Sequence, residues 1–377
     1  MSHKNTAQEA FDAIEADLQR ISRSLYDNPE TAYQEFESSR LLADFIGSQG
    51  VEVTYPAYGM ETSFEATAGS TGPRVVICCE YDGLPEVGQA CGHNIIATAA
   101  VGAGLAVAPI AEELGIRVTV LGTPAEEGGG GKIQLLEAGA FEDAAASMMI
   151  HPFPTDMIDK SFQAARGFIV EFTGKESHAG FAPHLGVNAL DAFVQAYMNV
   201  ATLRQHYLPT DRTHCIINHG GDAQNIIPAY TSSTWGIRAA TGERLEELVG
   251  KVTACWEAAA SATGCELKVT PVAEPYLDVK TNSAMAELYQ ANSESLGRPM
   301  PREEVVEGGS TDMGNVSQVV PSIHPMVAID AQGAVNHQKE FAAATVTASG
   351  DLAIRDGALA MAFTIIDMAD QDIWGTL

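Results

Sequence analysis

The chain has 377 residues, of which 46% are hydrophobic and 19% are charged, and its net charge is −28 from 49 acidic and 21 basic residues. This length exceeds what one hydrophobic core usually serves, so we expect two domains, and the composition excludes a disordered protein. The strong negative charge argues against nucleic acids and anionic membranes as partners.

Two further features bear on location. The N-terminal segment is a polar amphipathic helix pattern without the apolar stretch of a secretory signal. The most apolar run, residues 97–110, is about 14 residues long and falls short of the roughly 20 that span a bilayer. The six cysteines are scattered without a framework spacing, which is typical of reduced thiols. We therefore expect a cytoplasmic protein.

The first part of the chain, 1–167, shows alternating helix and strand patterns. Apolar spacing predicts helices and strands in this order: a helix at 8–24, a helix at 34–49, a strand at 74–82, a long Ala-rich helix at 94–114 and a strand at 116–127. Strand–helix–strand order predicts a mostly parallel sheet of the α/β class. The strands end in Glu80-Tyr81-Asp82 and Glu126-Glu127, at the sheet edge where ligands bind.

The middle of the chain, 168–274, has a different order of predicted helices and strands. Its predicted order is a strand at 168–174, a helix at 186–206, strands near 213–219 and 229–240, a helix at 243–263 and a strand at 265–271. This βαββαβ order predicts a ferredoxin-like α+β domain with an antiparallel sheet. Residues 275–377 resume the first pattern, so we interpret the middle domain as an insertion into a catalytic domain.

Residues that bind metals occur at successive predicted strand ends. Cys91-Gly92-His93 precedes the long helix, Glu126-Glu127 ends a strand, His151 follows another, and His337 lies in a downstream polar loop. Each residue alone is more often structural. Thiolate, imidazole and carboxylate together suit Zn²⁺, Mn²⁺ or Co²⁺. Two ions need about five or six such ligands, one of them bridging, so the pattern indicates a metal site.

Several strings carry a family resemblance: CEYDGLPEVGQACGHNIIA, GTPAEEGGGGK, MIHP, GKESHAGFAPHLGVNALDA, GGDAQNIIPAY and GGSTDMGNVSQVVPSIHP. They resemble the co-catalytic metallopeptidase and amidohydrolase family, which includes aminoacylases, glutamate carboxypeptidase and indole-acetyl-amino-acid hydrolases. The nearest likeness is to its aminobenzoyl-glutamate hydrolase and β-alanyl-lysine dipeptidase-like branches. The resemblance covers nearly the whole chain. It implies a zinc-exopeptidase-like catalytic domain with an inserted lid or dimerisation domain.

The resemblance also implies roles for the metal-binding residues. Two divalent ions, Zn²⁺ or Mn²⁺ with Co²⁺ as a further candidate, are expected on a bridging Cys91 and on the other ligands His93, Glu127, His151 and His337. Glu126 is the implied general base for a metal-activated water, and Asp82 is expected to orient a ligand. This chain departs from many relatives at Glu80, where they place a ligating His. The role of Glu80 is therefore open.

Substrate contacts are implied in the same way. His178 resembles a donor to the developing oxyanion, although a surface histidine is the simpler reading of its sequence context. Asn225 and Arg238 resemble a pair that captures a substrate carboxylate, for which the planar guanidinium is well suited; a surface ion pair is the alternative for Arg238. Thr311 lies in a Gly-rich polar loop that we interpret as lining the pocket.

The expected function is hydrolysis of the amide bond of an N-acyl- or aminobenzoyl-amino acid or a small dipeptide. An aryl aminohydrolase that releases ammonia from the same site is a second hypothesis. A non-catalytic small-molecule-binding protein is a third, and the presence of the base Glu126 argues against it. We further expect a homodimer, because the inserted domain has an edge without obvious cover within the chain. The resemblance implies that the partner subunit's His178 completes each site; the alternatives are that His178 acts in its own subunit after lid closure and that the chain is monomeric.

Overall fold

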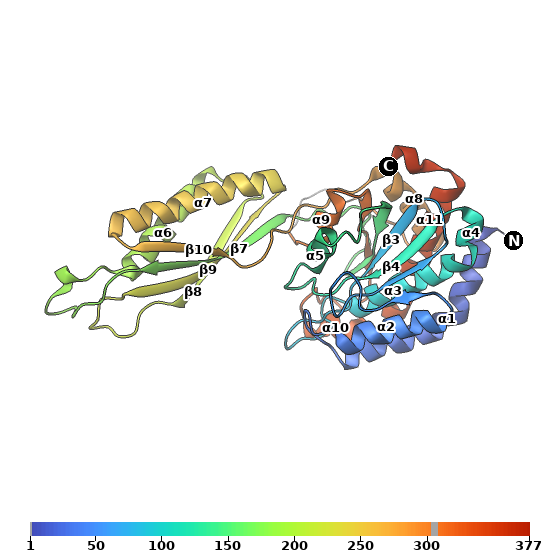
Figure 1. Cartoon of the computed structure of the whole chain (residues 1–377), viewed down its shortest axis with the longest axis horizontal. Coiled ribbons are helices and arrows are strands. Elements are labelled where there is room, and N and C mark those ends of the chain that lie inside the picture. Colours follow the sequence, from blue (N-terminus) through green and yellow to red (C-terminus); the bar gives the residue numbers. More distant parts are fainter. Residues whose placement is uncertain (1, 303–307) are drawn as a thin grey trace. The chain divides into compact units, whose positions relative to one another are not determined.

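The computed structural model describes residues 2–302 and 308–377, which form two compact units (Figure 1). The first unit takes in described residues up to 161, then 279–302 and 311–377. The second unit is made of residues 162–278 together with 308–310. The predicted insertion at 168–274 falls inside this second unit, whereas the short segment 308–310 lies outside the predicted range.

The first unit is built on a six-stranded sheet with the order β1-β2-β4-β3-β5-β11. Four strands, which form the centre and one edge of the sheet, run parallel to one another. They are β3 (Arg74–Cys79), β4 (Arg117–Gly122), β5 (Ala144–Met148) and the edge strand β11 (Ser322–Ile323). Two short strands that we did not predict, β1 (Val53–Thr54) and β2 (Glu65–Ala68), add on antiparallel at the other edge. The sheet is therefore mixed, with a parallel centre.

The predicted helices of the first unit are present as α1 (His3–Asp27), α2 (Phe36–Ser48) and α3 (His93–Val107). Helix α1 buries one stripe that includes Phe11 and Leu18, as expected for an amphipathic helix. Helix α3 is buried on every side and packs against α1 and against α11 (Ala348–Asp370). The helices approach closely because α3 has Gly102, where a Cβ atom would lie 2.8 Å from the ring of Phe11.

The helical stretch that starts with α3 runs from His93 to Leu114, which is longer than the apolar run at residues 97–110. Among the described residues, His93–Leu114 is the stretch long and apolar enough to cross a membrane by length and composition. However, 89% of its most apolar window is buried inside the protein. That degree of burial is the mark of a core helix.

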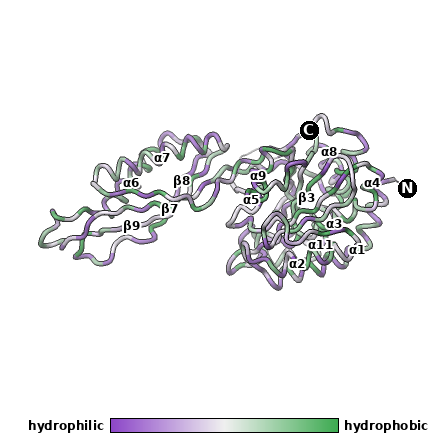
Figure 2. The backbone as a smooth tube through the Cα atoms, viewed as in Figure 1, coloured by the Kyte–Doolittle hydropathy of each residue, from purple (hydrophilic) through white to green (hydrophobic). Residues whose placement is uncertain are grey.

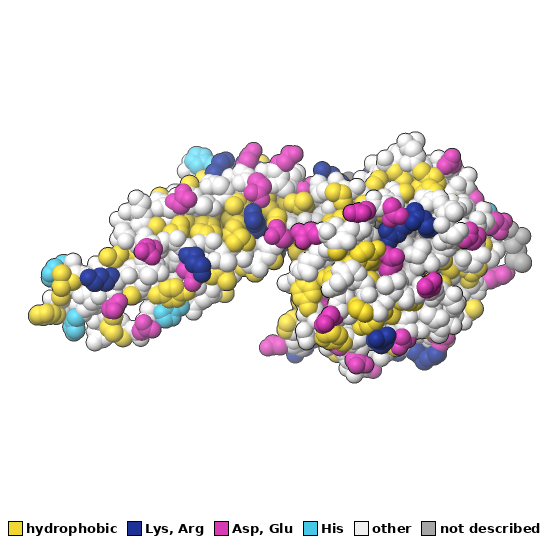
Figure 3. Space-filling view, in the orientation of Figure 1, with side chains coloured by type: hydrophobic (Ala, Val, Ile, Leu, Met, Phe, Trp, Pro, Cys, Tyr) yellow, Lys and Arg dark blue, Asp and Glu magenta, His cyan; other side chains and the backbone are white. Residues whose placement is uncertain are grey.

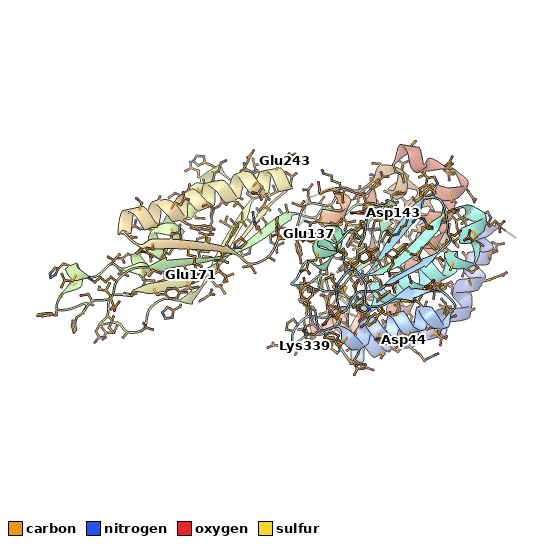
Figure 4. All side chains as sticks on the ribbon, viewed as in Figure 1. Asp44, Glu137, Asp143, Glu171, Glu243 and Lys339 are labelled. Carbon is orange, nitrogen blue, oxygen red and sulfur yellow. The ribbon has the colours of Figure 1, made fainter. Side chains whose placement is uncertain are left out.

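The remaining elements of the first unit are short apart from α8. They are η1 (Ala108–Ile110), α4 (Ala111–Leu114), α5 (Gly131–Glu137), β6 (His151–Phe153), α8 (Ser283–Ser295), α9 (Met313–Ser317), β12 (Met326–Ala328), α10 (Lys339–Ala344) and η4 (Ile373–Thr376). At the amino end of the parallel strands, Asp143 accepts hydrogen bonds from Arg74 and Arg117, each at 2.7 Å (Figure 4). These ion pairs fix the start of β3 and β4, at the edge opposite the predicted site.

The second unit has the predicted βαββαβ order. Its elements are β7 (Ala164–Thr173), η2 (Pro183–Leu185), α6 (Ala189–Leu203), η3 (Arg204–His206), β8 (Arg212–His219), β9 (Tyr230–Ala239), α7 (Gly242–Thr263) and β10 (Glu266–Pro271). The sheet order is β10-β7-β9-β8, antiparallel throughout, so the ferredoxin-like prediction is confirmed.

The core of the second unit is aromatic. Trp256 on α7 packs edge-on against both Phe168 on β7 and Trp235 on β9. Figure 2 shows hydrophilic and hydrophobic residues alternating along α7, as expected for a helix with one face on a sheet. On the sheet, Glu171 (labelled in Figure 4) accepts hydrogen bonds from Tyr230 at 2.6 Å and Lys268 at 3.0 Å, and so links three neighbouring strands.

Candidate metal centre

The predicted metal-binding side chains meet in the first unit, at the carboxyl edge of the parallel strands. Glu80 and Asp82 follow β3, Glu126 and Glu127 follow β4, and His93 is the first residue of α3. Cys91 lies just before α3, His151 opens β6, and His337 comes from the loop before α10. Their ligand atoms form three groups in which all members lie within 4.8 Å of one another: Cys91, His93 and His151; Cys91, Glu127 and His337; and Glu80, His93 and Glu126.

The separations within these groups suit shared metal ions. The Cys91 Sγ lies 3.5 Å from the His151 Nε2 and 3.6 Å from the His337 Nε2. Zinc–sulfur and zinc–nitrogen bonds at a tetrahedral angle place the two ligand atoms about 3.6 Å apart. The His337 Nε2 also lies 3.6 Å from the Glu127 Oε2. The thiol therefore belongs to two groups at distances that ligands of one ion adopt.

Buried partners orient the histidine rings. The His93 Nδ1 donates to the Asp82 Oδ1 at 2.9 Å, and the His151 Nδ1 donates to the Pro152 carbonyl at 2.8 Å. In both rings this leaves the Nε2 as the ligand atom, which is the arrangement found around protein-bound metals. The second oxygen of Asp82 accepts the Glu127 backbone N–H at 3.0 Å, so Asp82 holds two of the candidate ligands.

Buried polar atoms without partners test whether a cation fits. Within the described part of the chain, the Glu80 Oε2, the His93 Nε2 and the Glu127 Oε1 are buried and have no hydrogen-bond partner. Buried polar groups are nearly always satisfied, so three unsatisfied atoms in one cluster call for a ligand. All three are lone-pair atoms of metal-binding residue types, and the donor set fits divalent cations.

The backbone around the site is held in unusual conformations. Ala125, directly before the Glu126-Glu127 pair, has a left-handed φ of +61°, and His337 has a φ of +71°. The buried Glu35 accepts the Ala125 N–H through its Oε1 at 2.9 Å, and the Ala90 carbonyl accepts the His337 N–H at 2.8 Å. Such strained residues persist only where surrounding contacts fix them, and they are common at active sites.

Burial and charge also set protonation in the cluster. Burial lowers the pKa of His151 to about 4, so its ring is neutral at neutral pH and keeps a lone pair for a metal. Burial, then the charges of Glu80 and Glu127, raise the pKa of Glu126 well above its usual value. A carboxylate with a raised pKa is a stronger base, which suits proton transfer near neutral pH.

The predicted substrate-binding residues are placed as follows. His178 is exposed in the second unit, and its Nδ1 accepts N–H groups from Gly180 at 3.2 Å and Phe181 at 3.0 Å. The exposed Asn225 lies next to it, because its carbonyl accepts the Ala179 N–H at 2.9 Å.

Arg238, on β9 of the second unit, donates to the Ser310 hydroxyl at 3.1 Å. Thr311 belongs to the first unit and is buried, and its hydroxyl accepts the Met313 N–H at 3.2 Å.

Four further side chains near the site were not predicted. Lys132 and Asp312 form a buried ion pair at 2.7 Å, Glu35 holds Ala125, and the ring of His324 lies 5.6 Å from that of His151. A lysine inside the string GGGGKIQLL was the one available signal, since an isolated charge in a glycine-rich and apolar segment suggests a buried partner.

Comparison with known proteins identifies relatives of this chain. Residues 163–263 match the peptidase dimerisation domain family. The Xaa-Arg dipeptidase of Mus musculus is 38% identical over 97% of this chain and 88% of its own length. One of the p-aminobenzoyl-glutamate hydrolase subunits of Escherichia coli is 33% identical over 75% of this chain and 64% of its own length.

A solved structure has the same fold. The dinuclear metal-binding peptidase of Bacillus subtilis superposes with a TM-score of 0.73 at 19% identity, covering 94% of this chain and 99% of that one. The donor cluster and the relatives together define a metal-dependent hydrolase that acts on C–N bonds of the peptide type. Within that class, the chain belongs to the M20 peptidase family.

Proposed function

We propose that the protein hydrolyses an amide bond of a small substrate with a free carboxylate, using two divalent ions. The residues that would hold the ions are Cys91, His93, Glu127, His151 and His337, and Cys91 would be shared between the two sites. The observation that carries the proposal is the membership of Cys91 in two separate ligand groups, one with His93 and His151 and one with Glu127 and His337. The dinuclear metal binding named for the Bacillus subtilis neighbour supports it.

The ions, which we propose to be Zn²⁺ or Mn²⁺ with Co²⁺ as a substitute, supply Lewis acidity to a water and to the amide carbonyl when bound. Glu126 then acts as the general base. Its carboxylate accepts a proton from the attacking water and later returns that proton to the leaving nitrogen. The burial of Glu126 among other acids supports this role, because both effects raise its affinity for a proton.

His178 is the proposed donor to the oxyanion. Since its Nδ1 accepts two backbone N–H groups, the neutral ring carries its proton on Nε2, where it is able to donate. Asn225 and Arg238 are the proposed anchors of the substrate carboxylate, and Thr311 is proposed to line the pocket. Desolvation lowers the pKa of the Arg238 guanidinium, as expected for a half-buried cation that gains from an anionic ligand.

A homodimer forms part of this proposal. The match to a dimerisation domain covers residues 163–263 of the second unit, and β8 is one of the two edge strands of its sheet. Ile216 and Ile217 on that strand are 66% and 50% exposed, and Val194 and Met198 on α6 are also exposed. Exposed apolar edges of this kind are normally covered, and a two-fold partner is the usual cover. We also propose a cytoplasmic location.

The substrate proposal is an N-acyl-amino acid, an aminobenzoyl-amino acid or a small dipeptide. The two curated relatives suggest the first compounds to assay: dipeptides that end in arginine, and p-aminobenzoyl-glutamate. The net charge of −28 favours the cationic dipeptides over the dianionic glutamate conjugate.

A substrate panel with metal analysis tests the proposal. The purified protein should contain two divalent ions per subunit by mass spectrometry, lose activity with a chelator, and release a free amino acid. Release of ammonia without an amino acid would support the aryl aminohydrolase instead. Tight binding of substrates without turnover by the metal-loaded protein would support a binding protein.

A further inference from the structure

Glu80 is the residue whose role the family resemblance leaves open. It follows β3 directly and is fully buried. Its Oε1 lies 2.5 Å from the Lys132 Nζ, and the same ammonium lies 2.7 Å from the Asp312 Oδ1. The Asp312 Oδ2 accepts the Lys132 backbone N–H at 2.9 Å. One oxygen of Glu80 is therefore fixed by a buried and doubly anchored cation.

The other oxygen of Glu80 is differently placed. The Glu80 Oε2 lies 3.4 Å from the His93 Nε2, and neither atom has a hydrogen-bond partner among the described residues. The two atoms face each other without forming a hydrogen bond. Nitrogen and oxygen ligands of one tetrahedral zinc ion lie about 3.4 Å apart, given metal–ligand distances near 2.1 Å. The separation is that of two ligands of one ion.

The same local arrangement recurs at the other candidate ligands. Asp82 occupies the Nδ1 of His93 and the Pro152 carbonyl occupies the Nδ1 of His151, which leaves one lone-pair atom of each ring for the metal. Lys132 acts on Glu80 in the same way, because it donates to the Oε1 and leaves the Oε2 available to a metal ion. A buried carboxylate oxygen without a partner is unfavourable, and a bound cation removes that cost.

We propose that Glu80 is a further metal ligand through its Oε2, on the ion that His93 binds, and that Lys132 and Asp312 position it. The proposal rests on the metal centre of the proposed function. A carboxylate would then serve in this chain at the position where the family resemblance implies a ligating histidine. Lys132 offsets part of the negative charge of Glu80 and Asp312, because both carboxylates lie against its ammonium.

Metal binding by a Glu80→Gln variant tests the assignment without reference to activity. Equilibrium dialysis against Zn²⁺ and Mn²⁺, read by mass spectrometry, should show that the dissociation constant of one ion rises by more than about tenfold. The second ion should keep its affinity. The exposed Glu61→Gln variant is the matched control and should bind both ions as the parent protein does. In the Co²⁺-loaded protein, the visible absorption of one ion should change in Glu80→Gln and not in Glu61→Gln.

A Lys132→Met variant separates positioning from ligation. It should weaken the same ion as Glu80→Gln, and adding it to Glu80→Gln should weaken that ion no further. Should Glu80→Gln fail to fold, Glu80→Asp keeps the charge next to Lys132, withdraws the carboxylate by one methylene, and should still weaken one ion.

Two outcomes are distinguishable. If Glu80→Gln binds both ions with unchanged affinity while Cys91→Ser loses them, Glu80 is not a ligand and the metal centre stands. If Cys91→Ser also keeps both ions, the proposed centre itself is wrong.

Discussion

The two units of this protein hold their candidate functional side chains in different ways. In the first unit, Glu80, Asp82 and His93 are fully buried, and each is fixed by a partner inside the same unit. In the second unit, His178 and Asn225 are exposed, and the segment around them displays Phe181 at 85% exposure. Figure 3 shows hydrophobic and histidine side chains on the surface of the second unit.

The difference separates two kinds of preorganisation. The candidate metal ligands lie within one unit, and hydrogen bonds aim His93, His151 and Glu80 before any ion or substrate binds. The His178 segment fixes its ring tautomer but leaves apolar side chains in water, a condition that contact with another surface relieves. Substitutions in the first unit should therefore act on metal and chemistry, and substitutions in the second unit should act through assembly and substrate.

The Glu126-Glu127 pair gives the largest expected effect and tests the first half of the comparison. Glu126→Gln should keep both ions and lower kcat by at least about 10²-fold, because it removes the general base. Glu127→Gln should lose metal as well as activity, because it removes a ligand. Steady-state kinetics with metal analysis of both variants gives the answer. Normal turnover by Glu126→Gln would exclude the proposed mechanism.

Mixed dimers test the second half. His178→Ala and Glu126→Gln should each be nearly inactive alone, since loss of one oxyanion donor costs about 10²–10³-fold. If the partner subunit's His178 completes each site, a mixed dimer has one site with native Glu126 and native His178. Activity should return to about a quarter of the parent level after random exchange, because half of the dimers are mixed and half of their sites are intact.

The control for this experiment is mass measurement of the exchanged sample. Mixed dimers that form and stay inactive would show that His178 acts in its own subunit. A protein that is monomeric at assay concentrations would exclude both versions of the dimer.

Arg238 tests substrate recognition with a smaller effect. Arg238→Ala should raise KM, because the substrate loses about 1.5–3 kcal/mol of binding free energy. This is the range for a hydrogen bond to a charged group. Amidated substrates should be poor for the parent enzyme and no worse for the variant. Persistent preference of the variant for free acids would place the carboxylate anchor elsewhere.

Much of this architecture was predictable because its signals are local. Periodic apolar spacing predicted α1, α2 and α3. The change in the order of predicted helices and strands after residue 167 indicated the ferredoxin-like unit. The clustering of several candidate ligands was predictable because Glu80, Glu127 and His151 follow strand ends, and parallel strands bring such ends together. The full ligand set came from the family resemblance. The structure places Cys91, His93 and His151 within one group, as the pattern suggested.

The rest was not predictable because it depends on distant partners. Lys132 and Asp312 are 180 residues apart, so their ion pair leaves no local pattern. The edge strands β1 and β2 are too short, at two and four residues, to show periodicity. Glu35 reaches Ala125 across 90 residues, and its sequence context is that of an ordinary residue before a helix.

Glu35 yields the last expected effect, which is one of stability and not of chemistry. Burial raises the pKa of Glu35 from 4.5 to about 7 in the folded protein. The folded state therefore holds this proton more tightly than the unfolded state. Stability should fall by roughly 3 kcal/mol as pH rises from about 4.5 to 7 and stay level above that, since one pKa unit corresponds to about 1.4 kcal/mol. Glu35→Gln keeps an acceptor for the Ala125 N–H and cannot ionise, so its unfolding temperature relative to the parent should rise across this pH range.

The comparison requires chelated protein, because bound metal adds its own pH dependence. Glu61→Gln, an exposed change in the same unit, should follow the parent curve. A constant difference between Glu35→Gln and the parent from pH 5 to pH 8 would mean that Glu35 ionises freely in the fold, and that the backbone at Ala125 does not depend on a buried acid.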